Sequence, residues 1–347
     1  MVAKAEQAAK QKKPFNLAKW AKSRDGQKTI IILAFIIIPL LLLFVFTYLP
    51  FAEMVKFSFY KMKYTTPVEK RVFVGLQNYI DVFKRDDIFS SLKLSLYYMA
   101  GSIVQLALSL YLATILSFKT KGGNLFKGVM FFPFLINGIA IGFIFKFFYT
   151  RGFVFDTVLS WCGFNLENLP YWLKDQSINN ISLVATSVWR YFGQNMVMFI
   201  GAIMSVDAEM YEAADLDGAN KLQQFFYIIL PSIKTIVTLN VILSITGSLS
   251  AFEPPYVITG GSNGTGTYFV IMNEIAHVSQ KVGLASAMAI VLFLIIFLCT
   301  LLQKLFFKYI FRNSESDDGM TAKQVKEQKK RMKQEKKLAK MQAKGAR

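Results

Sequence analysis

Six long apolar runs constrain this chain more than any other feature. Each is close to the roughly 20 residues that a helix needs to cross the hydrocarbon core of a bilayer. Backbone polar groups inside a bilayer need internal hydrogen bonds, which a helix supplies. The runs therefore predict an all-α membrane protein with six transmembrane helices. The predicted spans cover residues 29–49, 92–118, 125–149, 178–205, 231–252 and 284–311.

The amino-acid composition agrees with this prediction. Hydrophobic residues make up 54% of the chain, whereas soluble domains contain about 45–50%. The 33 Phe and 15 Tyr residues are typical of lipid-facing helices and of aromatic belts at the membrane surface. The first apolar run is longer than the core of a secretory signal and lacks a small-residue cleavage site after it, so it is predicted to be retained.

Lys and Arg residues indicate the orientation. Residues 1–28 form a basic arm, and residues 312–347 form a charged tail without an apolar stripe that could dock it. With both termini in the cytoplasm, most of the 40 Lys and Arg residues fall on the cytoplasmic side, as the positive-inside rule requires. The arm is expected to be solvated or to lie on anionic lipid, and the tail to be disordered. Nucleic-acid binding is not predicted, because the adjacent span accounts for the charge of the arm.

The sequence offers no set of residues for catalysis or for metal binding. Cys162 and Cys299 make no disulfide framework or metal set, and the single histidine, His277, falls in a predicted loop. No phosphate-binding Gly-x-x-x-x-Gly-Lys-Ser/Thr motif occurs, and the glycine-rich run 260–267 lacks the lysine. We expect no catalytic residues, no metal site and no cofactor bound by this chain.

A polar, interrupted segment, residues 207–231, separates the fourth and fifth predicted spans. Its pattern predicts a short helix capped by Asp207, a break at Gly218, and a second short helix. Pro231 suits the first turn of the following apolar helix. The segment can be read as an ordinary capped loop or as a helix that docks on a partner. The charge bias places it in the cytoplasm.

This segment resembles the EAA loop of ABC importer permeases. The matching positions keep the full spacing of that motif and are Glu212, Ala213, Ala214, Gly218, Ile228, Leu230 and Pro231. The stretches 75–79, 256–261 and 283–287 are similar to the sugar-importing branch, so the resemblance covers about residues 30–311. Two departures are Asp207, where sugar permeases often carry proline, and Ser262-Asn263, where many carry Gly-Pro.

The resemblance implies a type I ABC importer permease fold in a bacterial cytoplasmic membrane. It implies a second homologous permease, two copies of an ABC ATPase that bind ATP and Mg²⁺, and an extracytoplasmic solute-binding protein. The matching loop residues would couple the permease to the ATPase, and the chain would form half of the pathway for a sugar, most simply an oligosaccharide. Alternatives are glycerol phosphate or a polyol as cargo, or an ion-coupled secondary transporter. A phosphate would need cations, of which only Arg190 is evident, and ion coupling would need carboxylates, of which the predicted span interiors contain none.

Polar residues inside the predicted spans are candidates for the substrate path, because such groups are costly in lipid. Asn240, Ser244 and Ser248 share one helical face at four-residue spacing. Hydrogen bonding between helices is an equally simple use of these residues, and it is the favoured one for Gln105 and Asn137. With the regions that the resemblance adds, the candidate substrate-path residues are Arg190, Gln194, Asn240, Ser244, Gly247, Ser248 and Phe252.

Overall fold

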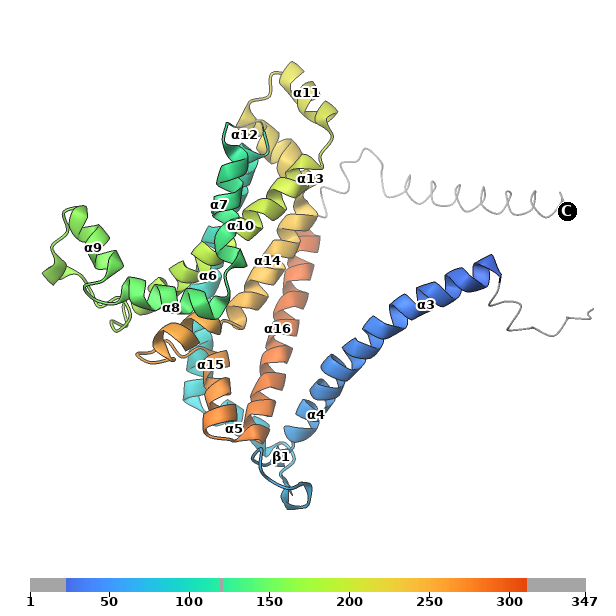
Figure 1. Cartoon of the computed structure of the whole chain (residues 1–347), viewed down its shortest axis with the longest axis vertical. Coiled ribbons are helices and arrows are strands. Elements are labelled where there is room, and N and C mark those ends of the chain that lie inside the picture. Colours follow the sequence, from blue (N-terminus) through green and yellow to red (C-terminus); the bar gives the residue numbers. More distant parts are fainter. Residues whose placement is uncertain (1–22, 119–120, 311–347) are drawn as a thin grey trace, which may run out of the picture.

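The computed structural model describes residues 23–118 and 121–310. Most of the predicted N-terminal arm, the predicted tail and the last residue of the sixth predicted span lie outside the described residues. Helices dominate the fold (Figure 1). In chain order the elements are α3 (Arg24–Leu43), η1 (Phe44–Tyr48), α4 (Leu49–Phe57), β1 (Tyr60–Lys61), η2 (Val68–Lys70), β2 (Val72–Phe73), α5 (Gln77–Lys84), α6 (Asp86–Leu116), α7 (Gly123–Leu135), α8 (Gly138–Tyr149), α9 (Val154–Trp161), η3 (Leu166–Asn168), α10 (Asn179–Met204), α11 (Ala208–Leu216), α12 (Lys221–Gln224), η4 (Phe225–Ile229), α13 (Leu230–Ser232), α14 (Lys234–Leu249), η5 (Pro255–Thr259), α15 (Tyr268–Asn273), η6 (Glu274–Val278) and α16 (Val282–Ile310).

Several helices are long and apolar enough to cross a membrane. Three continuous stretches qualify by length and composition, and two further pairs of helices qualify if each bent pair is one span. The single sheet among the described residues is the antiparallel pair β1–β2, in which Tyr60 lies opposite Phe73. The predicted all-helical membrane fold is thus confirmed in its class, whereas the count of six spans stays a prediction. The continuous stretches are Arg24–Phe57, Asp86–Leu116 and Val282–Tyr309.

The main core lies where α10 crosses α6 and α7. Met196, Phe199 and Ile203 of α10 are almost completely buried, together with Ala113 of α6. The backbones of α10 and α7 approach closely because Gly193 has no side chain. A Cβ atom at this position would lie 1.8 Å from the carbonyl oxygen of Met130. The sequence of α10 is amphipathic because one of its faces packs in this core and the other is turned toward polar groups.

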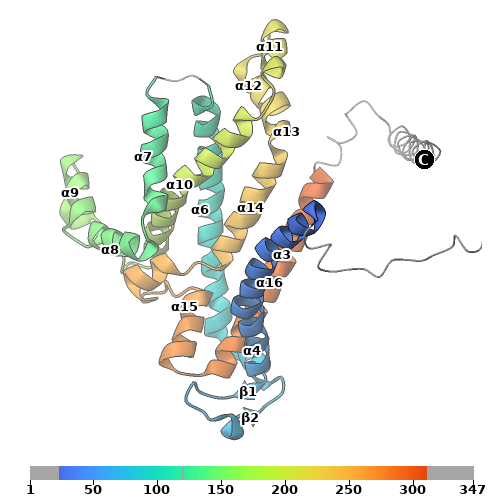
Figure 2. The ribbon, with the colours of Figure 1, turned by 45° about the vertical axis from the view of Figure 1, so that its right-hand side comes forward.

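A second core lies at the end of the bundle where α5, α15 and α16 meet. Tyr268 is fully buried there, and its hydroxyl donates to the Met288 carbonyl at 2.9 Å. Asn78 of α5 donates to the carbonyls of Ser58 and Tyr60 at 2.8 and 3.0 Å, which holds the β1–β2 hairpin against the same core. This end is opposite the end that carries α11 (Figure 2).

The first predicted span stands away from the bundle. In α3, which the structure describes completely, Gly26 is the one buried residue, and Phe35 is 76% exposed. The helix joins the rest of the molecule through α4, where Phe51 packs edge-on against Phe293 of α16 at 5.6 Å. Figure 1 shows α3 diverging from the bundle, with α4 at the end that meets α16. In a membrane, lipid or another protein must cover this apolar surface.

Two predicted spans are broken in the structure. The run 125–149 divides into α7 and α8, which are inclined by 98°. Asn137 lies at this break, and its side chain accepts a hydrogen bond from the Ile139 backbone N–H at 2.9 Å. Asn137 therefore caps α8, and the expectation that it bonds between helices is wrong. The run 231–252 is bent by 74° at Ile233, so Pro231 ends the loop segment and does not open the straight part of the span.

Candidate functional site

The segment 207–231 forms the tip of the molecule at one end of the bundle (Figure 1). Gly218 adopts a φ of +77°, a conformation in which a residue with a Cβ atom is strained. The predicted break at Gly218 is confirmed, because α11 ends at Leu216 and α12 begins at Lys221. Asp207 occupies the N-cap position of α11, but its side chain accepts no hydrogen bond there. The predicted side-chain cap is therefore wrong.

Side-chain hydrogen bonds connect the two short helices of the tip. Asp215 accepts from Gln224 at 2.5 Å and from Lys221 at 3.1 Å, and these two bonds lower the pKa of the Asp215 carboxyl. Asn220 and Gln223 form a reciprocal capping box at the start of α12. The two short helices are thus tied to each other across the turn at Gly218.

The exposed face of α11 has no partner within the part of the chain that the structure describes. Glu209, Glu212, Ala213 and Leu216 are exposed at helical spacing, and the Leu216 side chain is 89% exposed. Ala214 lies on the opposite face and is only 9% exposed. We call Glu209, Glu212, Ala213 and Leu216 the tip face. The remaining motif residues Ile228, Leu230 and Pro231 are half-buried in the stem between the tip and α14.

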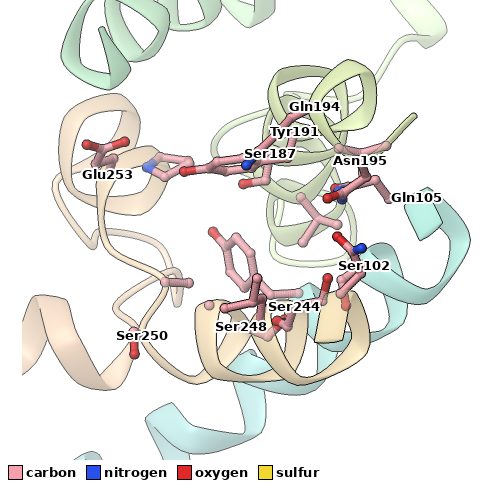
Figure 3. Close-up of a pocket in the computed structure, with 18 of the residues that line it drawn as sticks. Ser102, Gln105, Ser187, Tyr191, Gln194, Asn195, Ser244, Ser248, Ser250 and Glu253 are labelled. Atoms are coloured by element: carbon pink, nitrogen blue, oxygen red, sulfur yellow. The ribbon is translucent and has the colours of Figure 1, made fainter. Parts of the chain in front are cut away.

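A polar cavity of about 480 Å³ lies between α6, α10 and α14 (Figure 3). Most of its polar lining is uncharged and carries hydroxyl or amide groups. The polar lining residues are Tyr98, Ser102 and Gln105 from α6, Ser187, Tyr191, Gln194 and Asn195 from α10, Asn240, Ser244 and Ser248 from α14, and Ser250 and Glu253 from the segment after α14.

Most of the candidate path residues meet at this cavity. Gln194 faces the predicted polar face of the fifth span across it. Two of the cavity residues also bond within their own helix, because Asn240 donates to the Ile236 carbonyl at 2.9 Å and Ser248 to the Ser244 carbonyl at 2.7 Å. The candidates in the lining are Gln194, Asn240, Ser244, Gly247 and Ser248.

Arg190 and Phe252 do not line the cavity. Phe252 stacks on Tyr256, with ring centroids 4.7 Å apart, and packs edge-on against Phe269. Phe252 is therefore part of the packing beside the cavity.

Arg190 forms an ion pair with Glu253, and its guanidinium lies 5.1 Å from the centroid of the Tyr191 ring. The Arg190 side chain is 15% exposed and that of Glu253 is 42% exposed. Gly138, at the start of α8, touches the pair so closely that a Cβ atom would overlap both groups. The pair therefore joins α10, the α7–α8 break and the segment after α14. The sequence predicted no carboxylate inside the six spans. Glu253 does not conflict with this prediction, because it lies one residue beyond the predicted end of the fifth span.

Sequence reasoning missed several cavity residues. The Tyr98 side chain is 6% exposed, and its hydroxyl has no hydrogen-bond partner among the described residues. Tyr98, Ser102 and Gln105 recur at spacings of four and three, which places them on one face of the second span. This spacing is the signal that could have found Tyr98 and Ser102, since Gln105 was already noted as a polar residue of this span. For Glu253 no such signal exists, since it lies outside the apolar run.

Breaking the ion pair is expected to destabilise the protein. In Glu253→Gln the mostly buried Arg190 guanidinium loses its counter-charge, which typically costs about 1.5–3 kcal/mol. Thermal unfolding in detergent would measure the change, with Glu69→Gln on an exposed turn as the control. A double Arg190→Met, Glu253→Met variant is expected to recover much of the loss, because no charge is left unpaired. Equal stability of all three variants and the wild type would contradict this role.

Comparison with known proteins identifies the family. The model of the "Binding-protein-dependent transport system inner membrane component" family matches residues 105–312. The chain is 32% identical to the probable ABC transporter permease protein YurN of Bacillus subtilis, over 78% of this chain and 94% of that protein. It is 31% identical to the arabinooligosaccharides transport system permease protein AraP of Halalkalibacterium halodurans, over 67% of this chain and 74% of that one.

Solved structures share the fold. A crystal structure of a bacterial ABC transporter that imports the acidic polysaccharide alginate contains a chain that matches with a TM-score of 0.70 and 16% identity. The match covers 83% of this chain and 98% of the other. The same kind of transporter in complex with an alginate pentasaccharide-bound periplasmic protein matches with a TM-score of 0.67, also at 16% identity, over 84% of this chain and 98% of the other. At this identity the likeness shows the fold alone.

These permeases are non-enzymatic components of the inner membrane that work with a binding protein and a separate ATPase subunit. The long apolar helices agree with a multi-pass location in that membrane. The family model and the relatives each cover more than half of the chain. This chain belongs to the inner-membrane components of binding-protein-dependent transport systems, the ABC transporter permeases.

Proposed function

We propose that this chain is one of two homologous permease subunits of a type I importer, and that its cargo is an uncharged sugar, in the simplest case an oligosaccharide. The observation that carries the proposal is the lining of the cavity between α6, α10 and α14, which combines hydroxyl and amide side chains with the rings of Tyr98 and Tyr191. Relatives named for arabinooligosaccharides and for multiple sugars support the same class of cargo.

The chemistry of this lining suits a sugar. Hydroxyl and amide groups can both donate and accept hydrogen bonds, as sugar hydroxyls do. Aromatic rings offer an apolar surface to the faces of sugar rings. A volume of about 480 Å³ falls in the usual range for small-molecule sites, roughly 300–1,000 Å³. The cavity therefore offers room and matching groups for one or two sugar units of a longer chain.

The charge of the cavity argues against an anionic cargo. Glu253 is the one charged side chain among the described lining residues, and it is paired with Arg190. No cation in the described lining is left to hold a phosphate or a carboxylate. A polyol stays compatible with this lining, whereas glycerol phosphate is disfavoured. Membership of the ABC family also removes the ion-coupled alternative, because the energy comes from an ATPase.

The tip face is proposed as the docking site of an ATPase subunit. A short helix with one exposed face is suited to a groove on a partner, and the bonds of Asp215 make the tip stiff enough to transmit a push. Two ATPase copies, which hold ATP and Mg²⁺, would bind this chain and a second permease. The second permease would cover the exposed apolar surface of α3. This assignment places the tip and both termini in the cytoplasm. ATP drives transport only if the ATPases bind it more tightly in one global state of the permease pair.

A panel of cargo candidates tests the proposal. The assembled importer in liposomes would be assayed for ATPase activity with its binding protein and with neutral oligosaccharides, a polyol, uronate oligosaccharides and glycerol phosphate. Neutral oligosaccharides are expected to stimulate the activity. Stimulation by the phosphate ester alone would overturn the choice of cargo.

Bulky substitution on the cavity face of α14 is expected to change the cargo response. Ser244→Leu removes a hydroxyl and fills space in the cavity, so stimulation by the preferred sugar should fall about tenfold, the effect of losing roughly 1.4 kcal/mol of binding. Thr235→Leu introduces the same side chain on the same helix outside the described lining and serves as the control. An unchanged sugar response in Ser244→Leu would favour a packing role for this face.

Removing the Tyr98 hydroxyl separates binding from stability. Tyr98→Phe deletes a buried hydroxyl that has no hydrogen-bond partner among the described residues, so thermal stability should be unchanged or slightly higher. Sugar-stimulated ATPase activity should fall, because a hydroxyl that bonds the cargo is lost. A clear loss of stability together with a normal sugar response would contradict this role for Tyr98.

A further inference from the structure

Helix α9 carries an apolar face that nothing in the described chain covers. It follows α8 and lies on the side of the bundle away from α3 (Figure 1). Phe155 packs it onto α8 through Phe148 and Tyr149, with ring centroids 5.2 and 5.6 Å apart. The outer face of α9 points away from these contacts.

The helix is held in place by its own segment. Asp156 is 1% exposed and accepts hydrogen bonds from the Trp172 indole and the Gly152 backbone N–H, both at 2.7 Å. The Arg151 guanidinium donates to the carbonyls of Leu166 and Leu169, and its Nε lies 3.7 Å from the Asp156 carboxylate. These bonds fix the orientation of α9, so its outer face is a defined surface.

That face is an apolar stripe. Val154, Val158 and Trp161 lie four and three residues apart, on one side of the helix. They are 51%, 40% and 80% exposed. The one charged residue of α9, Asp156, is turned inward and bonded. Thr157 is also exposed on this face, and its hydroxyl donates to the Phe153 carbonyl at 2.8 Å. The rest of the outer face is hydrocarbon and an indole ring.

The stripe continues onto α8. Ile139, Phe143 and Phe147 recur along α8 at four-residue spacing and are 54%, 53% and 60% exposed. Phe147 packs against Phe153, with ring centroids 6.3 Å apart, and so joins the two exposed surfaces. Lys146, in the last turn of α8, is exposed as well, and its long side chain can reach the lipid headgroups. In a chain of the inner membrane, the remaining apolar surface of α8 is unfavourable in water. The continuous surface points to the same solvent for both helices, which is lipid.

We propose that α9 is a membrane anchor whose Val154–Val158–Trp161 face lies in lipid. Trp is enriched where proteins meet the lipid headgroups, and helices with one apolar face and one polar face settle there. The anchor would also steady a neighbouring turn. Asn179, at the end of the segment that α9 begins, donates to the Asn263 carbonyl in the glycine-rich loop at 2.8 Å.

Quenching of tryptophan fluorescence tests the anchor. The full chain, purified with the subunits that accompany it, would be placed in nanodiscs of phosphatidylcholine with plain or brominated acyl chains. The difference between the wild type and Trp161→Phe isolates the Trp161 signal, which brominated lipid is expected to reduce at least twofold and aqueous iodide to leave unchanged. Trp189→Phe, a matched substitution away from α9, should keep the Trp161 component of the quenching.

A label on native Cys162 gives a second measurement that leaves α9 unaltered. Cys162 directly follows α9 and is exposed, so a bimane attached there, in a Cys299→Ser chain, should also be quenched by brominated lipid. Quenching of both probes by iodide and not by lipid would overturn the anchor, because the face would then lie in water. Protection of both probes from both quenchers would overturn it as well, since a protein partner would then cover the stripe.

Discussion

Replacing Glu212 with lysine is expected to abolish transport while the protein still inserts in the membrane. Glu212 is exposed on the tip face, where the structure gives it no partner among the described residues. A reversed charge at the centre of a docking face leaves a like or unpaired charge at the contact, which costs several kcal/mol. Leu216→Asp is expected to act in the same way. The Leu216 side chain is 89% exposed and available for an apolar contact, and the substitution puts a charge in its place.

The readout for the tip face is the ATPase subunit itself. Both variants should lose co-purification of the ATPase from detergent extracts by tenfold or more, whereas their amount in the membrane stays normal. Glu69→Lys makes the same charge reversal on an exposed turn at the opposite end of the bundle, and it should retain the ATPase. Normal uptake by both tip variants would refute the docking role. This outcome would leave the lipid anchor at α9 untouched, because the two surfaces share no residue.

Replacing Gly193 with alanine is expected to disrupt the packing of the whole membrane bundle. A Cβ atom at Gly193 would lie 1.8 Å from the Met130 carbonyl oxygen and 2.8 Å from the Phe131 Cα atom. These are backbone atoms, so α7 as a whole must move away from α10. Overpacking of a core typically costs about 1–3 kcal/mol, and a contact with backbone should reach or exceed the upper end. The displacement would also move Gln194 in the cavity, so sugar-stimulated ATPase activity should fall with stability.

Gly201→Ala is the matched control on the same helix. A Cβ atom at Gly201 meets nothing within 4 Å, and alanine favours a helix over glycine by about 1 kcal/mol. Thermal unfolding should therefore show Gly201→Ala as stable as the wild type or more so, and Gly193→Ala as clearly less stable. If the two variants unfold at the same temperature, the close approach of α7 and α10 does not limit the stability of this fold.

The sequence predicted the local structure of the segment 207–231 well because its signals are local. The break at Gly218, the short helices on either side of it and the spacing from Glu212 to Pro231 depend on residues that are neighbours in the chain. The sequence predicted only part of the cavity lining. Asn240, Ser244 and Ser248 stand on one helix at a fixed spacing, so one helical period predicts their common face. Their neighbours Tyr98 and Glu253 come from other elements, and the helical period of the fifth span does not indicate which residues of other elements face it.

The sequence by itself determined that the chain is helical, lies in a membrane and belongs with ABC permeases, because run length, charge bias and motif spacing are properties of the linear chain. Only the tertiary structure decided where the apolar runs break. The hydrophobicity of a run indicates whether it is long enough to span a membrane, but it does not reveal the bend of 98° between α7 and α8. It also decided that Arg190 is neutralised by Glu253, 63 residues away. That pairing depends on helix crossings made possible by glycines at 138 and 193, where the absence of a side chain lets helices and an ion pair approach to contact.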